Sequence, residues 1–326
     1  MGTSTRDIFG DDREAAFATP GSYGQSPPGY RLPDSTKLGP VHLQVANLDR
    51  SLAYYESVLG LRLVERMDAR ATLAAQGDNH ALIVLHERAG ARPMTPRGRL
   101  GLYHFALLVP DRPTLGTFVA HLADRSVRVG SADHLLSEAL YLQDPDGLGI
   151  EVYADRPRAD WKRIGRELMM ASDPLDLPSL VASAGTARWV GMPTGTAIGH
   201  VHLHVGDVGV AGAFYADALG FDRMVWQYPG ALFLGAGGYH HHLGNNTWAG
   251  PSAVPPAADD ARLLEWTIEL PDRKSLRAAC ESLVSAGYDA EAQNGDVVVR
   301  DPWGTLVRLR VAVDVLAHAV PRAASS

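Results

Sequence analysis

The sequence predicts an α+β protein in which four βαβββ modules pair into two domains. A duplication is the first sign of this: Gly-Pro-Val-His-Leu-Gln-Val at 39–45 returns 160 residues later as Gly-His-Val-His-Leu-His-Val at 199–205. The second sign is an Asp-Pro-x-Gly sequence in each half, at 144–147 and 301–304. Proline presets φ there, and glycine takes the positive-φ position of a turn between strands. Such repeats indicate a fold built from copies of one unit.

Each module is predicted to run from an apolar strand through a helix to three short strands. In the first module the strand covers residues 40–46, and Leu52, Tyr55 and Leu59 follow at helical spacing until Gly60 ends the helix. Short alternating strands are expected after this, at 61–66, 70–75 and 80–86. The same order places the four modules at about 38–88, 99–155, 197–247 and 262–312.

We expect the modules to pair in the order in which they follow along the chain. The Gly-, Pro-, Ser- and Asp-rich start is predicted to be an arm that is partly ordered at best, and a helix is predicted over 161–170. The predicted parts are an N-terminal arm (1–36), an N-terminal domain with the metal site (37–155), a connector (156–196), a C-terminal domain without a complete metal triad (197–314) and a tail (315–326).

Composition excludes several classes of partner. With 46% hydrophobic and 21% charged residues, the 326-residue chain is typical of a globular protein. A net charge of −7 without runs of Lys and Arg predicts no nucleic-acid or anionic-membrane partner, and no apolar stretch is long enough for a transmembrane helix. Cys280 is the only cysteine, so no intrachain disulfide can form. This favours a reducing, cytoplasmic location, with Cys280 as a small buried residue on a helix.

Histidines carry the chemical signal. Thirteen are present, several of them inside apolar, strand-like runs. Strands of the repeated modules place the following residues in register: His42, His104, His202 and Trp266 on the first strands, and Glu151 and Arg308 on two of the last. The first half therefore offers His42, His104 and Glu151 as metal ligands. Two histidines and one carboxylate suit a non-haem Fe(II) site that keeps positions open for substrate and oxygen. A guanidinium cannot ligate a cation, so no complete site is expected in the second half.

A longer motif supports this hypothesis. Residues 134–151 read His-x5-Leu-Tyr-x2-Asp-Pro-x-Gly-x3-Glu, and this segment, with 39–45 and 239–248, resembles the vicinal oxygen chelate superfamily. Within it the chain is similar to two-domain type I extradiol dioxygenases of the catechol 2,3-dioxygenase-like group, over about residues 31–312. The resemblance implies two domains of that fold, an Fe(II) cofactor with Mn(II) as an alternative, and a small aromatic diol and O2 as substrates. The implied reaction opens a catechol next to its vicinal diol, giving a 2-hydroxymuconic semialdehyde-type product.

The resemblance also implies roles for individual residues. His80 is expected to be the acid–base residue, with His86 as its competitor, while His134 and Tyr141 are expected to hydrogen-bond substrate oxygens. The consecutive histidines 240–242 alternate between faces of a strand and cannot all ligate one ion, so a structural or interface role is expected for them. Family analogy implies a homo-oligomer.

Two other functions use the same scaffold. A glyoxalase- or epimerase-like isomerase would need a fourth protein ligand, expected near residues 81–85, but these read Ala-Leu-Ile-Val-Leu and cannot ligate a metal. A metal-free small-molecule binding protein of the resistance type would have no use for the triad, nor for His134 and Tyr141. Both alternatives therefore rank below the dioxygenase.

Overall fold

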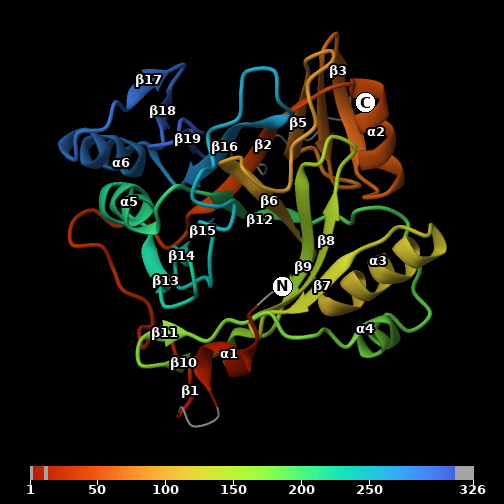
Figure 1. Ribbon diagram of the computed structural model, residues 1–326, viewed down its shortest axis with the longest axis horizontal. Coiled ribbons are helices and arrows are strands. Elements are labelled where there is room, and N and C mark those ends of the chain that lie inside the picture. Colours follow the sequence, from red (N-terminus) through yellow and green to blue (C-terminus); the bar gives the residue numbers. More distant parts are fainter. Residues whose placement is uncertain (1–2, 11–13, 313–326) are drawn as a thin grey trace, which may run out of the picture.

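The computed structural model describes residues 3–10 and 14–312. Within them, the strands form two eight-stranded sheets and a small three-stranded one. Figure 1 shows α5 and α6 on one side of the molecule and α2 and α3 on the other, with β2, β6 and β12 between them. None of the helices in these ranges is long and apolar enough to span a membrane.

The two large sheets are named here by their central strands. The β6–β12 sheet has the spatial order β13 (Asp222–Val225), β14 (Ala231–Gly235), β15 (Leu243–Asn246), β12 (Ala197–His204), β6 (Gly101–Leu108), β9 (Gly149–Asp155), β8 (Ser137–Gln143) and β7 (Gly130–Asp133). The β2–β16 sheet has the order β17 (Glu291–Gln293), β18 (Asp296–Arg300), β19 (Leu306–Val311), β16 (Arg262–Leu270), β2 (Lys37–Val45), β5 (Ala81–Glu87), β4 (Arg70–Ala74) and β3 (Arg62–Met67).

Helices connect these strands in the predicted order. They are α1 (Thr5–Phe9), α2 (Leu48–Ser57), α3 (Arg112–Asp124), α4 (Leu177–Ser183), α5 (Val208–Ala211), which continues as a π-helical segment (Gly212–Ala218), and α6 (Arg273–Ser285), with a 3-10 turn at Arg158–Asp160. Helix α2 begins after Asn47, whose side chain accepts a hydrogen bond from the Arg50 amide at 2.8 Å. Cys280 lies on α6 as predicted and is half-buried. The four βαβββ modules are thus confirmed.

The modules pair differently from the prediction. Strand β6 of the second module lies antiparallel to β12 of the third, while β2 of the first lies antiparallel to β16 of the fourth. Each large sheet therefore contains one module from residues 37–155 and one from residues 197–312. A module's first strand has an open edge that the first strand of any other module can cover, so strand patterning alone does not specify the partner.

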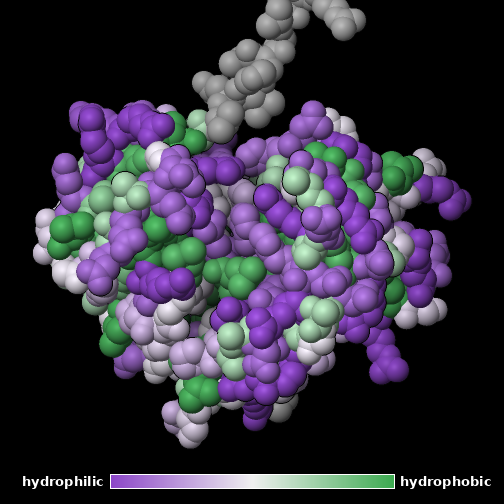
Figure 2. Space-filling view, turned by 90° about the horizontal axis from the view of Figure 1, so that it is seen from above, coloured by the Kyte–Doolittle hydropathy of each residue, from purple (hydrophilic) through white to green (hydrophobic). Residues whose placement is uncertain are grey.

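A continuous apolar core lies behind the two sheets. Along β12, Val201 and Leu203 are fully buried in this core, whereas the histidines that alternate with them point to the opposite face. The same alternation on β6 buries Phe105 and Leu107 and turns His104 to the histidine face. Figure 2 shows hydrophilic groups spread over one face of the molecule, with hydrophobic groups in smaller patches between them.

The segments outside the modules are more ordered than expected. In the arm, Leu32 is buried and its amide donates to Gly220 O at 2.8 Å, while Arg31 pairs with Asp222 at 2.6 Å. The helix predicted over 161–170 is wrong. Those residues form a hairpin of β10 (Lys162–Ile164) and β11 (Glu167–Leu168), and β1 (Ala16–Phe17) pairs with β10. Gly165, with a φ of 59°, provides the positive-φ residue of this turn.

Candidate metal centre and cavity

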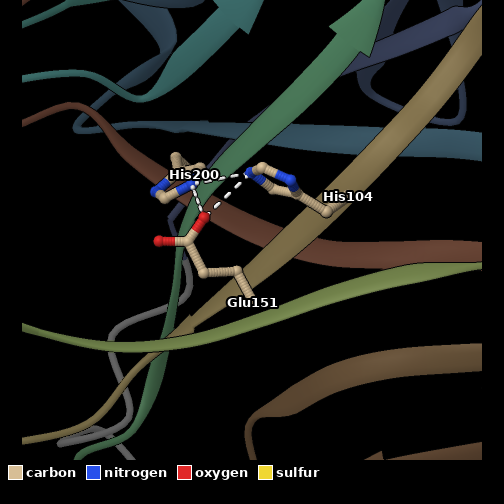
Figure 3. Close-up of side chains that lie close together, drawn as sticks. All are labelled: His104, Glu151 and His200. Carbon is tan, nitrogen blue, oxygen red and sulfur yellow. Dashed lines mark hydrogen bonds and ion pairs between the residues drawn. The ribbon is translucent and has the colours of Figure 1, made fainter. Parts of the chain in front are cut away.

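Three buried donors converge on neighbouring strands of the β6–β12 sheet. They are His104 on β6, Glu151 on β9 and His200 on β12, and Figure 3 shows their side chains pointing toward one another. Glu151 Oε2 lies 2.9 Å from His104 Nε2 and 3.1 Å from His200 Nε2, and the two nitrogens are 3.3 Å apart. Among the described residues, these three side chains form the one group of at least three His, Cys, Asp or Glu residues that could hold a metal ion.

Strand register assembles this group. Ala106 on the central strand β6 lies opposite Glu151 on one side and His200 on the other. His104 is two residues from Ala106 and therefore points to the same face. Because alanine is small, the longer side chains of its neighbours can meet above it. Three strands that are distant in sequence thus place three donor atoms at one point.

The donor set fits a divalent cation. Two imidazole nitrogens and a carboxylate oxygen are the ligands of many Fe(II), Mn(II) and Zn(II) sites. The Nε2 atoms of His104 and His200 face each other, and they cannot both donate a hydrogen bond to Glu151 and also accept one from each other. A cation therefore satisfies all three ligating atoms better than hydrogen bonds do. His200 Nδ1 is also buried and has no hydrogen-bond partner among the residues that the structure describes.

The surroundings of His104 and Glu151 shift the pKa values of both side chains. Burial lowers the pKa of His104, which favours the neutral imidazole that ligates metals. Burial raises the pKa of Glu151, but the two neighbouring histidines outweigh this effect and hold the pKa well below its ordinary value. The carboxylate therefore stays ionised.

The structure does not bring His42 to His104 and Glu151. His42 lies on β2 in the other large sheet, where its Nδ1 is 3.1 Å from His86 Nε2 and its Nε2 is 3.9 Å from Glu265 Oε1. Arg308 Nε donates to that same Glu265 oxygen at 2.7 Å. The predicted triad of His42, His104 and Glu151 requires neighbouring modules to share a sheet, and they do not.

His200 is the candidate donor that sequence reasoning missed. The 160-residue repeat drew attention to His202, which matches His42, but His202 lies opposite His104 on the paired strands. Its Nε2 accepts a hydrogen bond from Asn246 Nδ2 at 2.9 Å. His200 is two residues earlier on the same face, so the alternation of histidines at 200, 202 and 204 was the signal that could have found it.

His134 and Tyr141 lie in the cavity beside the three donors, as the motif led us to expect. His134 Nδ1 donates a hydrogen bond to Ala171 O at 2.6 Å. His134 Nε2 therefore accepts a hydrogen bond from the Tyr141 hydroxyl at 2.5 Å. Burial raises the pKa of Tyr141 well above its ordinary value, so the hydroxyl remains protonated. The pair has one fixed hydrogen-bond direction.

His80 and His86 lie elsewhere. His80 precedes β5 in the other large sheet, with its Nε2 3.8 Å from Glu269 Oε1, and His86 is on β5 against His42. Neither lines the cavity that contains His104, Glu151 and His200. The reason is again the module pairing, because the whole first module belongs to the β2–β16 sheet.

His241 enters the cavity instead. Its ring centroid is 4.2 Å from that of His200, while His240 and His242 point to other surroundings. His240 Nε2 donates to Asp155 Oδ1 at 2.8 Å, so its Nδ1 accepts from His241 Nδ1 at 2.7 Å. His241 Nε2 is therefore unprotonated and carries a lone pair. The alternation noted in the sequence could have singled out the middle histidine, but it did not show which face is functional.

The cavity has a volume of about 680 Å³ and two kinds of wall. Polar groups surround the three donors, whereas aromatic rings form the wall beyond them. Tyr103 packs against His104 with ring centroids 4.9 Å apart and against Trp248 at 5.9 Å. The aromatic wall consists of Tyr103, Tyr228, Phe233 and Trp248. Such a cavity fits a planar, largely apolar small molecule with polar groups at one end.

Comparisons with known proteins identify a family and a relative. The family model described as Glyoxalase/Bleomycin resistance protein/Dioxygenase superfamily matches residues 37–152 and 197–309. The protein named Catechol-2,3-dioxygenase from Bacillus subtilis (strain 168) is 43% identical over 273 residues, which is 82% of this chain and 95% of the relative.

Two solved structures share the fold. A presumed dioxygenase from Bacillus subtilis subsp. subtilis str. 168 has a TM-score of 0.57 at 15% identity, covering 86% of this chain and 87% of its own. Glyoxalase I from Zea mays has a TM-score of 0.50 at 19% identity, covering 85% and 92%. At these identities, the likeness is one of fold alone.

Proposed function

This chain belongs to the Glyoxalase/Bleomycin resistance protein/Dioxygenase superfamily, and we propose that it is an extradiol dioxygenase that uses O2 to open a catechol-type ring next to its vicinal diol. One observation carries the proposal: a buried set of two histidines and one glutamate faces a cavity with an aromatic wall. The name of the relative that is 43% identical supports the same reaction.

His104, Glu151 and His200 would hold the metal, with Fe(II) as the proposed ion and Mn(II) as the alternative. Bound there, Fe(II) would supply the redox chemistry that lets O2 react with the ring. Three protein donors leave coordination positions free for substrate and oxygen. The described residues supply no fourth donor to this group, which favours the dioxygenase over a glyoxalase- or epimerase-like isomerase.

His241 is the proposed acid–base residue. The chain of hydrogen bonds from Asp155 through His240 directs the proton of His241 onto Nδ1. Its Nε2 is therefore able to take a proton from a catechol hydroxyl and to return it later. Burial lowers the pKa of His241 well below its ordinary value, so the ring is neutral.

His134 and Tyr141 are proposed to orient the diol. Both line the cavity, and the hydrogen bond between them holds the Tyr141 oxygen in place. That oxygen keeps a lone pair that can accept from a substrate hydroxyl. The aromatic wall would hold the ring by stacking and keep water away from the reacting bond.

A ring-cleavage assay tests the function. The protein is loaded with Fe(II) without O2, mixed with catechol and then exposed to air, while O2 uptake and the absorbance of the yellow semialdehyde are followed. We expect product in equal amount to O2 consumed, and only in iron-loaded protein. Absence of cleavage with unsubstituted, alkyl- and carboxylated catechols, in protein that retains iron, would contradict the proposal.

A further inference from the structure

One arginine that lines the cavity has no side-chain partner within the described part of the chain. The segment 92–99 carries three arginines, and two of them form ion pairs with Asp260, just before the fourth module. Arg92 Nε donates to Asp260 Oδ1 at 2.9 Å, and Arg99 Nε lies 3.3 Å from Asp260 Oδ2. The third, Arg97, lines the cavity, and its guanidinium has no hydrogen-bond or ion-pair partner among the described residues.

Backbone hydrogen bonds hold Arg97 next to the aromatic wall. The Gly98 amide donates to Ala249 O at 3.0 Å, and the Val254 amide donates to Gly98 O at 3.2 Å. The Thr95 hydroxyl donates to Arg97 O at 2.8 Å and orders the turn. Because Ala249 follows Trp248, these bonds place Arg97 beside the Trp248 end of the cavity. The loop thus presents a cation at a defined place.

This end of the cavity is open and aromatic. Tyr103 and Trp248 are 39% and 40% exposed, which is unusual for such large side chains, and both line the cavity. Glu151 is the only carboxylate among the described residues of the lining, and its charge is directed at the metal position. None of the described lining residues therefore neutralises the charge of Arg97.

The volume of the cavity leaves room beyond a simple catechol. A cavity of about 680 Å³ lies within the range of roughly 300–1,000 Å³ that is typical of sites for ligands much larger than a single benzene ring. A catechol seated at the three donors would leave the Trp248 end unfilled. A substituent on the ring would extend toward that end.

We propose that Arg97 and Trp248 form a subsite for an anionic ring substituent, so that the preferred substrate is a catechol carrying a carboxylate side chain. This inference rests on the proposed function and names its substrate class. The guanidinium pairs with the carboxylate, and the side chain between ring and carboxylate packs on the indole. A cationic substituent would be repelled, and a neutral one would bind without the ion pair.

Matched substrates and variants test the subsite. Catechols with a propanoate side chain at ring position 3 or 4 are compared with their neutral primary amides, in wild type, Arg97→Met, Arg97→Lys and Arg277→Met. Arg277 is an exposed arginine on α6, outside the cavity, and serves as the control. We expect wild type to prefer the carboxylate in kcat/KM, and Arg97→Met to lose about tenfold to a hundredfold of that preference. Arg97→Lys should keep part of the preference, and Arg277→Met all of it.

Binding measured without turnover separates this inference from the proposed function. Calorimetry on metal-loaded protein without O2 gives the affinity for each carboxylate and amide, whether or not the protein cleaves them. Tighter carboxylate binding that depends on Arg97 and weakens with added salt supports the subsite even if no ring is opened. Equal affinity for carboxylate and amide in wild type, or an unchanged preference in Arg97→Met, overturns it.

Discussion

At the scale of single residues, side-chain identity matters less than the residue's position along the strand. His200, His202 and His204 alternate on β12 and share one face, yet only His200 reaches Glu151. His202 and His204 are instead hydrogen-bonded to Asn246: Asn246 Nδ2 donates to His202 Nε2 at 2.9 Å, and His204 Nδ1 donates to Asn246 Oδ1 at 2.6 Å. Three similar residues in one strand thus have different environments.

The first prediction separates His200 from His42. His200→Ala should lose most of the bound metal and with it all turnover, because the remaining donors are one imidazole and one carboxylate. His42→Ala should retain wild-type metal content, since His42 lies in the other sheet. Metal analysis of both purified variants measures this directly. Metal loss in His42→Ala alone would restore the triad that the sequence suggested.

A second prediction concerns the acid–base residue. His241→Gln should keep the metal but slow kcat by roughly a hundredfold or more, because it removes the proposed base. His80→Gln should turn over at the wild-type rate, since His80 lies outside the cavity. Steady-state rates over a range of pH check this, and the pH dependence should change only in the His241 variant. A slow His80→Gln enzyme with normal His241→Gln rates would reverse the assignment.

At the scale of elements, a helical tyrosine in the first and in the third module binds the turn of the module that follows it. Tyr55 on α2 donates to Asp144 Oδ2 at 3.1 Å, and Tyr215 in the π-helical segment donates to Asp301 Oδ2 at 2.8 Å. These are equivalent positions of the repeat. Each aspartate opens an Asp-Pro-x-Gly turn, so the turn motif also joins the two large sheets.

The buried turn should make stability depend on pH. Burial raises the pKa of Asp144 from 3.8 to about 6, so the folded protein holds a proton that the unfolded chain releases. The contribution of Asp144 to the free energy of unfolding therefore falls by about 3 kcal/mol in all as the pH rises from about 4 to 6. Asp144→Asn keeps an acceptor oxygen for the turn amides but cannot ionise.

Urea unfolding of metal-free wild type and Asp144→Asn from pH 4 to pH 7 tests this. The difference in unfolding free energy between the two proteins should shift in favour of the variant up to about pH 6 and then stay level. Other titrating groups are common to both and cancel. A difference that is constant over the whole range would show that Asp144 is ionised throughout.

At the scale of the whole molecule, the interleaved modules make the two halves depend on each other. Residues 37–155 alone leave β6 without β12 and β2 without β16, and they lack His200. We expect this fragment to aggregate or stay unfolded, because both central strands would expose an open edge. Circular dichroism and gel filtration of the fragment, alone and co-expressed with residues 197–312, measure this. A stable, metal-binding 37–155 fragment would contradict it.

The local features of this protein follow from the order of its residues. Periodicity and turn residues predicted the four modules, and the motif at 134–151 located His134, Tyr141 and Glu151. These features could be predicted because they depend on neighbours in the chain, such as alternation along a strand or the φ preferences of Pro and Gly.

Tertiary structure alone decided which modules share a sheet, and with it which histidines meet. Pairing β6 with β12 brings His200 and His241 to His104 and removes His42 and His80 from it. It also sets the loop of Arg97 against Trp248. Strand edges are chemically alike, so the choice among them depends on how long connections and the shared core pack together, which no local pattern in the chain records.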